Sequence, residues 1–314
     1  MRFPFELRSD AIYDAVGFGT NAVDHLIRIP QFPSFASKIE LNDYSVAAGG
    51  EIASTMVGLN RLGHRTAYAG RLGSDREGEI GLQSLTDEGV GSEYVEIVQD
   101  ARTQVAFILI DESSGERTIL WSRDKKLAYS SDDAPVEAVR KARLLHMTPH
   151  DGAACIRMAS EANYAGVPVS IDVDNIFDGL DELLPLVNIC IASSEFPGKL
   201  TGISDRRGAL RDIQERYGCA VTGMTLGTMG SLILCDGTII QTNGYEVPGG
   251  CVDTTGAGDA FRSGFLHGIL LGVEVEIAAE MANAVAALKC RRPGARAGLP
   301  DASELAEVLG VSNT

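Results

Sequence analysis

The stretch Asp253-Thr-Thr-Gly-Ala-Gly-Asp259-Ala-Phe261 combines a loop of small residues, a carboxylate and the start of a helix. Gly256, Ala257 and Gly258 are small enough for three consecutive backbone N–H groups to point at one place. The small and apolar residues after Asp259 predict a helix. A helix N-terminus carries free N–H groups and a partial positive charge, which suits a phosphate. A carboxylate in the first turn places a proton acceptor beside that phosphate, so the stretch indicates phosphoryl transfer to a hydroxyl.

The composition is that of a soluble globular protein. The chain has 314 residues, enough for one large α/β domain or two domains, with 45% hydrophobic and 22% charged residues. Its 43 acidic and 27 basic residues give a net charge of −16. A nucleic-acid partner needs a basic face and is therefore not expected. No apolar run approaches a membrane span or a signal peptide, so we expect no membrane partner and a cytoplasmic location.

Short apolar segments alternate with helix-forming segments along most of the chain. We predict helices near residues 51–62, 75–88, 151–165 and 205–217, with Ser74-Asp-Arg-Glu77 as a capping box. This alternation indicates a mainly parallel sheet with helices on both faces, a three-layer α/β/α arrangement. The predicted buried strands are Ile12–Gly19, Thr66–Ala69, Leu144–Met147, Val167–Ile171, Ile189–Ala192 and Ala220–Thr225.

Two segments contain strands without helices and predict a small separate sheet. Residues 24–47 hold two prolines and then an extended stretch, and residues 103–123 are typical of a hairpin around a turn at 112–115. We therefore expect one domain, residues 1–314, with a lid built from these two segments.

The segment 256–290 predicts two helices rich in alanine and glycine. Small residues recur at every fourth position, so one face of the first helix can pack closely, and we expect it to pack on the sheet. These small residues are Ala260, Gly264, Gly268 and Gly272.

A second glycine pattern, Gly17-Phe-Gly19-Thr-Asn-Ala22, fits the dinucleotide fingerprint G-x-G-x-x-A. That fingerprint requires a helix beginning on the loop. The following residues include Pro30 and Pro33 and leave no room for one. A nicotinamide-dependent dehydrogenase is therefore not expected.

The stretch from Asp253 to Phe261 resembles the signature of the ribokinase-like carbohydrate kinases, the phosphofructokinase-B family, and looser matches extend from about residue 12 to residue 300. The resemblance implies a ribokinase-like three-layer fold with a β-sheet lid over the sugar site. It implies that Gly256, Ala257 and Gly258 form the anion hole and that Asp259 is the general base.

The resemblance also implies a substrate site. Gly19-Thr-Asn-Ala-Val-Asp24 matches a family pattern whose aspartate holds sugar hydroxyls, and a glycine pair precedes the helix near 51–62. The family's usual asparagines after that pair are replaced by Glu51 and Ser54. The predicted substrate residues are Asp24, Asn21, Gly49, Gly50, Glu51, Ser54 and Trp121.

Two interpretations of Glu51 stay open. It contacts substrate, in which case an acceptor-only carboxylate favours a neutral or amine-bearing polyol over a sugar acid or sugar phosphate. Alternatively it turns outward as the first-turn acid of its helix.

For the nucleotide, the resemblance implies ATP with Mg²⁺. Glu195, in Ala192-Ser-Ser-Glu195, would organise Mg²⁺ through water, and the asparagine usual before it is absent. The predicted nucleotide residues are Thr225, Gly227 and Gly230, with Asn283 near the adenine. In many members a monovalent cation such as K⁺ binds beside the positions of Asp253 and Thr255 and the loop 293–298.

We therefore predict an ATP-dependent kinase of a sugar or sugar-like alcohol. The hairpin at 111–121 resembles those of ketohexokinases and ribokinases, which favours a ketose or pentose. One alternative is a nucleoside kinase, with Tyr44, Phe107 or Trp121 stacking on the base; another is a non-catalytic sugar sensor on the same scaffold.

We also expect a homodimer joined through the lid strands, because a projecting sheet leaves apolar residues exposed. The alternating residues that we expect to need cover are Ile108, Ile110, Ile119 and Trp121.

Overall fold

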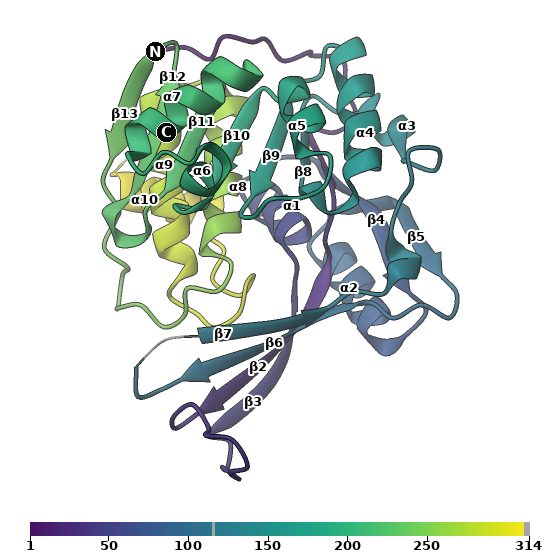
Figure 1. The fold of residues 1–314 in the computed structure, drawn as a ribbon, viewed down its shortest axis with the longest axis vertical. Coiled ribbons are helices and arrows are strands. Elements are labelled where there is room, and N and C mark those ends of the chain that lie inside the picture. The colour runs from purple at the N-terminus through teal and green to yellow at the C-terminus, as the bar shows by residue number, and fades with distance from the viewer. Residues whose placement is uncertain (115–116, 311–314) are drawn as a thin grey trace.

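The computed structural model describes residues 1–114 and 117–310, and within them the strands form one nine-stranded and one four-stranded sheet (Figure 1). The central sheet has the order β13-β12-β11-β10-β9-β8-β1-β4-β5. All neighbouring strands in it are parallel except β11–β12 and β12–β13, which are antiparallel. Its strands are β1 (Ala15–Phe18), β4 (Thr66–Gly73), β5 (Gly91–Val98), β8 (Leu145–Met147), β9 (Val169–Val173), β10 (Ile189–Ala192), β11 (Val221–Thr225), β12 (Ser231–Cys235) and β13 (Thr238–Thr242).

Helices cover both faces of this sheet, as predicted. The helices α3 to α7 pack on one face, and α1, α2, α8, α9 and α10 pack on the other. In the described residues, no helix is both long and apolar enough to cross a membrane. The helices are α1 (Glu51–Arg61), α2 (Arg76–Asp87), α3 (Val136–Val139), α4 (Gly152–Tyr164), α5 (Leu180–Leu183), α6 (Phe196–Thr201), α7 (Arg206–Tyr217), α8 (Ala257–Leu271), α9 (Val275–Lys289) and α10 (Ala302–Leu309).

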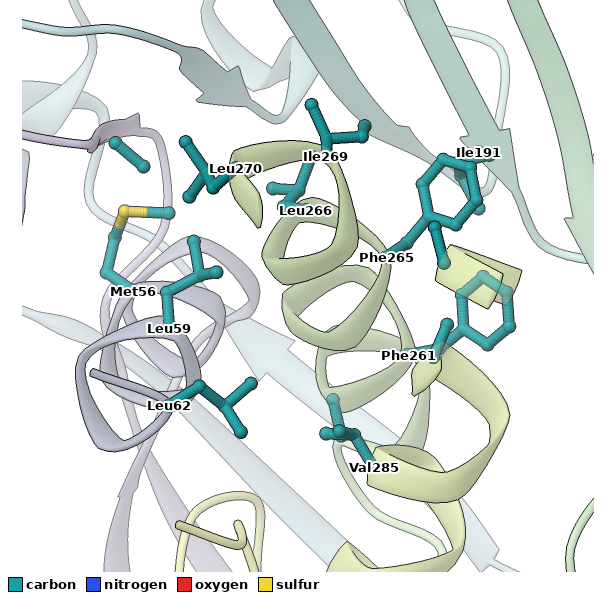
Figure 2. Packing of buried hydrophobic residues seen from close by; sticks show 14 of the residues in the cluster. Met56, Leu59, Leu62, Ile191, Phe261, Phe265, Leu266, Ile269, Leu270 and Val285 are labelled. Atoms are coloured by element: carbon teal, nitrogen blue, oxygen red, sulfur yellow. The ribbon is translucent and has the colours of Figure 1, made fainter. Parts of the chain in front are cut away.

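The central strands are apolar on both faces because both faces are covered. In β10, Ile189 and Ile191 belong to the cluster beneath α8, whereas Cys190 and Ala192 belong to the cluster on the other face. Figure 2 shows the first cluster, in which side chains of α1 meet the apolar face of α8. The helix that carries the signature loop is thereby fixed to the sheet.

The small-residue face of α8 packs on α9, not on the sheet, which corrects our expectation. A Cβ atom at Gly264 would lie 2.7 Å from the Cα atom of Ala282, and one at Gly268 would lie 2.7 Å from the Cα atom of Ala278. Small residues permit this close approach of two helices, and larger apolar residues of α8, such as Phe265, face the sheet.

The first turn of α2 is capped by Asp75 and not by Ser74. The Asp75 side chain accepts a hydrogen bond from the N–H of Gly78 at 2.9 Å. It also accepts hydrogen bonds from the N–H and hydroxyl of Thr103 at 2.8 and 2.7 Å. One carboxylate therefore joins the start of α2 to the beginning of the hairpin segment.

The four-stranded sheet is the lid, and it projects from one end of the molecule (Figure 1). Its order is β3-β2-β6-β7. The hairpin turn predicted at 112–115 lies partly outside the described residues, since 115 and 116 are not described. The lid strands are β2 (Ala22–Ile29), β3 (Asp43–Gly49), β6 (Gln104–Asp111) and β7 (Arg117–Ser122).

The two faces of the lid differ from the predicted pattern. The register pairs Asp24 with Ala106, and Ala106 with Trp121, so these residues share the inner face. Ile108 lies on the same face and is buried. The exposed apolar residues of the opposite, outer face are Tyr44, Val46, Phe107 and Leu120. Ile108, Ile110, Ile119 and Trp121, which we expected to need cover, therefore share the inner face, where Ile108 is buried and Ile119 and Trp121 are exposed.

Candidate active site

Most of the predicted site residues lie at one edge of the central sheet. β1, β9, β10 and β11 are parallel, so their carboxyl ends share that edge, where ligands bind in open α/β sheets. The loop after β1 carries Asn21, and the loops after β10 and β11 carry Glu195 and Gly227. α8 begins at Ala257 and packs beneath the same sheet.

The signature loop turns into α8 through Gly256, whose φ of 75° is in the left-handed region that favours glycine. The N–H of Ala257 donates to the carbonyl of Thr254 at 3.1 Å. Within the described residues, the N–H groups of Gly258 and Asp259 have no hydrogen-bond acceptor. The loop thus presents these N–H groups at the positive end of a 15-residue helix, while that of Ala257 is engaged within the loop.

Asp259 lies in the first turn of α8, with a half-buried side chain. No hydrogen bond from the described residues reaches its carboxylate. Burial and then the nearby Asp172 raise the pKa of Asp259 to about 7, against the opposing effect of Arg262. A carboxylate with a pKa near neutral and no donor attached is suited to accept a proton.

Beneath the loop lies a buried ion pair between Arg262 of α8 and Asp172 of β9. The guanidinium also donates to the carbonyl of Ile191 at 3.2 Å. Its Nη1 atom lies 2.8 Å from where a Cβ atom on Gly258 would be. Arg262 therefore places a positive charge directly beside the anion loop. We did not predict this role, although a charged residue on an otherwise small and apolar helix is a detectable signal.

Asp24 is 5% exposed, and no hydrogen bond from the described residues reaches its carboxylate. The carboxylate lies against the Cα atom of Gly49. Burial raises the pKa of Asp24 to about 7, and Arg296 opposes this effect. A nearly buried acceptor without donors is costly unless a ligand supplies them.

Arg296 occupies the place where we expected Asn21 and Ser54 to meet substrate. Its guanidinium donates to the Asn21 side chain at 3.0 Å, to the Ser54 hydroxyl at 3.2 Å and to the carbonyl of Gly49. The Nδ2 atom of Asn21 donates to the carbonyl of Gly81 at 3.2 Å. Asn21 and Ser54 therefore hold an arginine that joins the lid to α1, a network that sequence spacing did not reveal.

Glu51 points into the site, which answers the question that the sequence left open about its direction. Its carboxylate accepts a hydrogen bond from the Thr20 hydroxyl at 3.1 Å. Burial, followed by the charges of Asp259 and Asp174, raises the pKa of Glu51 to about 7. The half-buried side chain and its bond to Thr20 favour this inward interpretation over that of an outward first-turn acid, and contact with substrate stays a prediction. Gly50 is the N-cap residue of this helix.

Trp121 is on the inner face of the lid, the face that also carries Asp24 and is turned toward the body of the protein. Its ring meets that of His150 edge-on at a centroid distance of 6.4 Å, and His150 lies 5.1 Å from the ring of Phe177. Tyr44 and Phe107 are on the outer face of the lid and stack on His25. They are therefore unavailable for the base stacking that we considered for a nucleoside.

The predicted nucleotide residues lie near β11 and β12 of the central sheet. Thr225 ends β11, and Gly227 and Gly230 lie in the turn that follows. Asn283 is buried, and its amide donates to the Ser231 hydroxyl at 3.0 Å and to the carbonyl of Ala279 at 2.8 Å. These bonds make Asn283 a link between α9 and β12.

Glu195 is exposed and forms an ion pair with Lys199 at 3.2 Å. These two residues line a groove together with Arg206 and Met224. The described residues contain no group of three His, Cys, Asp or Glu side chains placed to hold a metal ion. Glu195 supplies a carboxylate to this groove, and Mg²⁺ is usually bound by one or two carboxylates together with substrate phosphates.

Asp253 and Thr255 are both buried at the start of the signature loop. The Asp253 side chain accepts hydrogen bonds from the N–H and hydroxyl of Thr255, both at 2.8 Å, and from the N–H of Gly294 at 2.7 Å. Its main-chain carbonyl accepts a hydrogen bond from the Lys289 ammonium at 2.9 Å. The lid also reaches this loop, because Arg117 donates to the Thr254 hydroxyl.

Comparison with known proteins identifies the family. The model of the pfkB family carbohydrate kinases matches residues 18–302. An uncharacterized sugar kinase of Archaeoglobus fulgidus is 32% identical over 252 residues, which cover 78% of this chain and 98% of that protein. A nucleoside kinase of Methanothermobacter thermautotrophicus is 25% identical, covering 93% of this chain and 94% of its own. The structure of Arabidopsis thaliana ribokinase complexed with ribose and ATP matches with a TM-score of 0.83 at 26% identity, covering 96% of this chain and 99% of that chain. The chain therefore belongs to the pfkB family of carbohydrate kinases and has the ribokinase-like α/β fold, which makes it an ATP-dependent sugar or nucleoside kinase.

Proposed function

We propose that this protein transfers the γ-phosphoryl group of ATP to a hydroxyl of a sugar or sugar-like substrate, with Asp259 as the general base. One observation carries the proposal: the Asp259 carboxylate has no donor in the described residues, has a raised pKa and adjoins the free N–H groups of the signature loop. A base and an anion site are thus adjacent at one helix N-terminus, as phosphoryl transfer to a hydroxyl requires.

In this mechanism Asp24 accepts hydrogen bonds from substrate hydroxyls, which gives its buried carboxylate the donors it lacks. Asp259 takes the proton from the attacking hydroxyl. The N–H groups of Gly258 and Asp259, in the first turn of α8, hold the phosphoryl group as negative charge develops on it. Arg262 lies beside this loop and adds a fixed positive charge.

Mg²⁺ would neutralise phosphate charge when bound, and Glu195 would organise it through water. The position of Glu195 at the carboxyl end of β10, in a groove with Lys199 and Arg206, supports this role. Thr225, Gly227 and Gly230 would lie along the nucleotide.

The charges in the site favour a neutral or amine-bearing substrate. Three carboxylates lie close together, those of Asp24, Glu51 and Asp259. The charge of Asp24 raises the pKa of Asp259, and the charge of Asp259 raises the pKa of Glu51. A sugar acid or a sugar phosphate would meet repulsion from them. A ketose or pentose remains our preferred substrate class within this limit.

A nucleoside kinase is the second candidate, because Trp121 of the lid and His150 and Phe177 of the body place aromatic rings beside the inner face of the lid. Aromatic rings on that side can stack on a base. The relative from Methanothermobacter thermautotrophicus that is described as a nucleoside kinase supports the same candidate.

A screen of ADP release across neutral sugars, amino sugars, sugar acids and nucleosides tests the proposal. We expect turnover with a neutral or amine-bearing sugar, and its loss in Asp259→Asn. A substrate that is turned over equally by the Asp259→Asn variant would remove Asp259 from the base role. A protein that binds a sugar but releases no ADP with any compound would support the sensor alternative.

We further propose that the protein forms a homodimer through the outer face of the lid. Tyr44, Val46, Phe107 and Leu120 are each at least 40% exposed on that face. β3 and β7 are also edge strands with free backbone groups. Such an apolar surface needs cover, and a second copy of the lid has the matching chemistry.

A further inference from the structure

Lys289, at the last turn of α9, is a fully buried lysine. Its ammonium donates to the main-chain carbonyl of Asp253 at 2.9 Å. Burial lowers the pKa of Lys289, whereas Asp253 and then Cys290 raise it. Lysines are almost never fully buried unless they are paired, so this side chain has a specific partner, and that partner is the signature loop.

The place that Lys289 occupies is the one where the resemblance to related kinases leads us to expect K⁺. A monovalent cation would be held by oxygen atoms of Asp253 and Thr255 and of the loop near Gly294. Here the carboxylate oxygens of Asp253 accept hydrogen bonds from Thr255 and Gly294, and its carbonyl oxygen accepts one from Lys289. A K⁺ ion that bound this carbonyl oxygen would meet the ammonium, a like charge, so the residues present do not fit K⁺.

We propose that the Lys289 ammonium takes the place of the monovalent cation, so that this kinase is indifferent to K⁺. The ammonium holds the carbonyl of Asp253 at the start of the loop. The Asp253 carboxylate in turn fixes Thr255, the residue before Gly256. Lys289 is therefore a positioning residue, which sets the loop that presents the anion-binding N–H groups.

The neighbours of Lys289 agree with this role. Gly298 packs against the backbone of Lys289 on one side, because a Cβ atom there would lie 2.8 Å from the Lys289 carbonyl carbon. The loop at Gly294 packs against the inner face of the lid, with a Cβ atom there 3.4 Å from Leu26. The ammonium thus lies where α9, the signature loop and the loop 293–298 meet. The lid covers the loop 293–298 at Gly294.

A melting experiment tests the proposal without any substrate, so its result is separate from that of the proposed function. The melting temperatures of the wild type, Lys289→Ala, Lys289→Met and the control Lys141→Ala are compared in KCl and in tetramethylammonium chloride at an ionic strength of about 0.1 M. Lys141 is exposed. We expect equal values in both salts for the wild type and the control. We expect Lys289→Ala, which opens a cavity beside the carbonyl, to melt about 2–4 °C higher in KCl. Lys289→Met fills the space with an apolar chain and should show no K⁺ effect.

The turnover arm rests on the proposed function and uses the substrate found by the screen. The wild-type rate should differ less than about twofold between the two salts. Lys289→Ala should be slow in tetramethylammonium chloride and regain about tenfold or more in KCl, and Lys289→Met should stay slow in both. Activation of the wild type by K⁺ would overturn the proposal, as would a Lys289→Ala variant that keeps wild-type melting and rate in both salts. If Lys289→Ala does not fold, the wild-type comparison between the salts still decides.

Discussion

Replacing Asp259 by asparagine should remove the proton acceptor while keeping the shape of the site. The carboxylate makes no hydrogen bond within the described residues, so the amide breaks no existing contact. General-base catalysis contributes about 10²–10⁴-fold, and we expect turnover to fall by that amount. Binding of ATP should change little, because the N–H groups of Gly258 and Asp259 belong to the backbone.

The pH dependence of the wild type follows from the raised pKa. Burial and Asp172 raise the pKa of Asp259 to about 7, and only the ionised form accepts a proton. The ionised fraction is about 0.1 at pH 6 and about 0.9 at pH 8, so kcat/KM should rise about tenfold across that interval. The Asp259→Asn variant should lose this fall in kcat/KM toward low pH, the acid limb of the pH profile.

The same shift predicts higher stability for the variant. The folded-state pKa lies above the ordinary value, so the folded protein binds this proton more tightly than the unfolded chain does. Ionisation of Asp259 therefore costs stability, progressively, as the pH rises from about 4 to 7. After allowance for the partial exposure of the side chain, Asp259→Asn should be more stable at pH 8 by about 1–3 kcal/mol.

An ADP-release assay across pH and a melting curve at pH 8 measure both effects. The control is Asp132→Asn, since Asp132 is an exposed aspartate outside the site. Wild-type turnover in the Asp259→Asn variant, or an acid limb that persists in it, would refute the base assignment. Lower stability at pH 8 would show instead that the ionised carboxylate is well solvated or paired.

Three further predictions address other parts of the molecule. Glu51→Gln should change kcat/KM for the best substrate by more than about 0.5 kcal/mol, the usual limit for a surface change; a smaller change would mean that Glu51 does not touch the substrate. Phe107→Asp should convert a dimer to a monomer in light scattering, whereas Tyr164→Asp, on the 90% exposed Tyr164 of α4, should not; a wild-type monomer at micromolar concentration would contradict the lid interface. Gly268→Leu should destabilise the protein by about 1–3 kcal/mol or more in denaturant unfolding, because a Cβ atom there would lie 2.7 Å from the Cα atom of Ala278; an unchanged midpoint would show that α8 and α9 can separate at low cost.

The sequence determined the layers and the signature loop because both depend on local patterns. Apolar segments such as Ile189–Ala192 are typical of a strand buried on both faces, and their alternation with helices indicates a parallel sheet. The stretch from Asp253 to Phe261 contains its own small-residue loop, N-cap residue and carboxylate, so its chemistry can be read from consecutive residues. The family comparison confirms the assignment that this stretch supported.

Only the tertiary structure decided where the isolated charges lie. Arg262, Lys289 and Arg296 are far from their partners in sequence: Arg296 meets Asn21, and Lys289 meets Asp253. No periodicity records such pairings, because they depend on how separate elements come together at one edge of the sheet. For the same reason the sequence could not show that Asn21 and Ser54 hold an arginine.

The direction of side chains on the lid was also beyond the sequence. A strand of alternating apolar residues has two sides, and the pattern alone does not say which side is turned toward the body of the protein. Pairing of β2 with β6 placed Asp24, Ala106 and Ile108 inward and left Phe107 outward. The sequence thus determined which chemical groups the protein has, and the packing of its layers decided which of them share a low-dielectric site, where their charges act on one another.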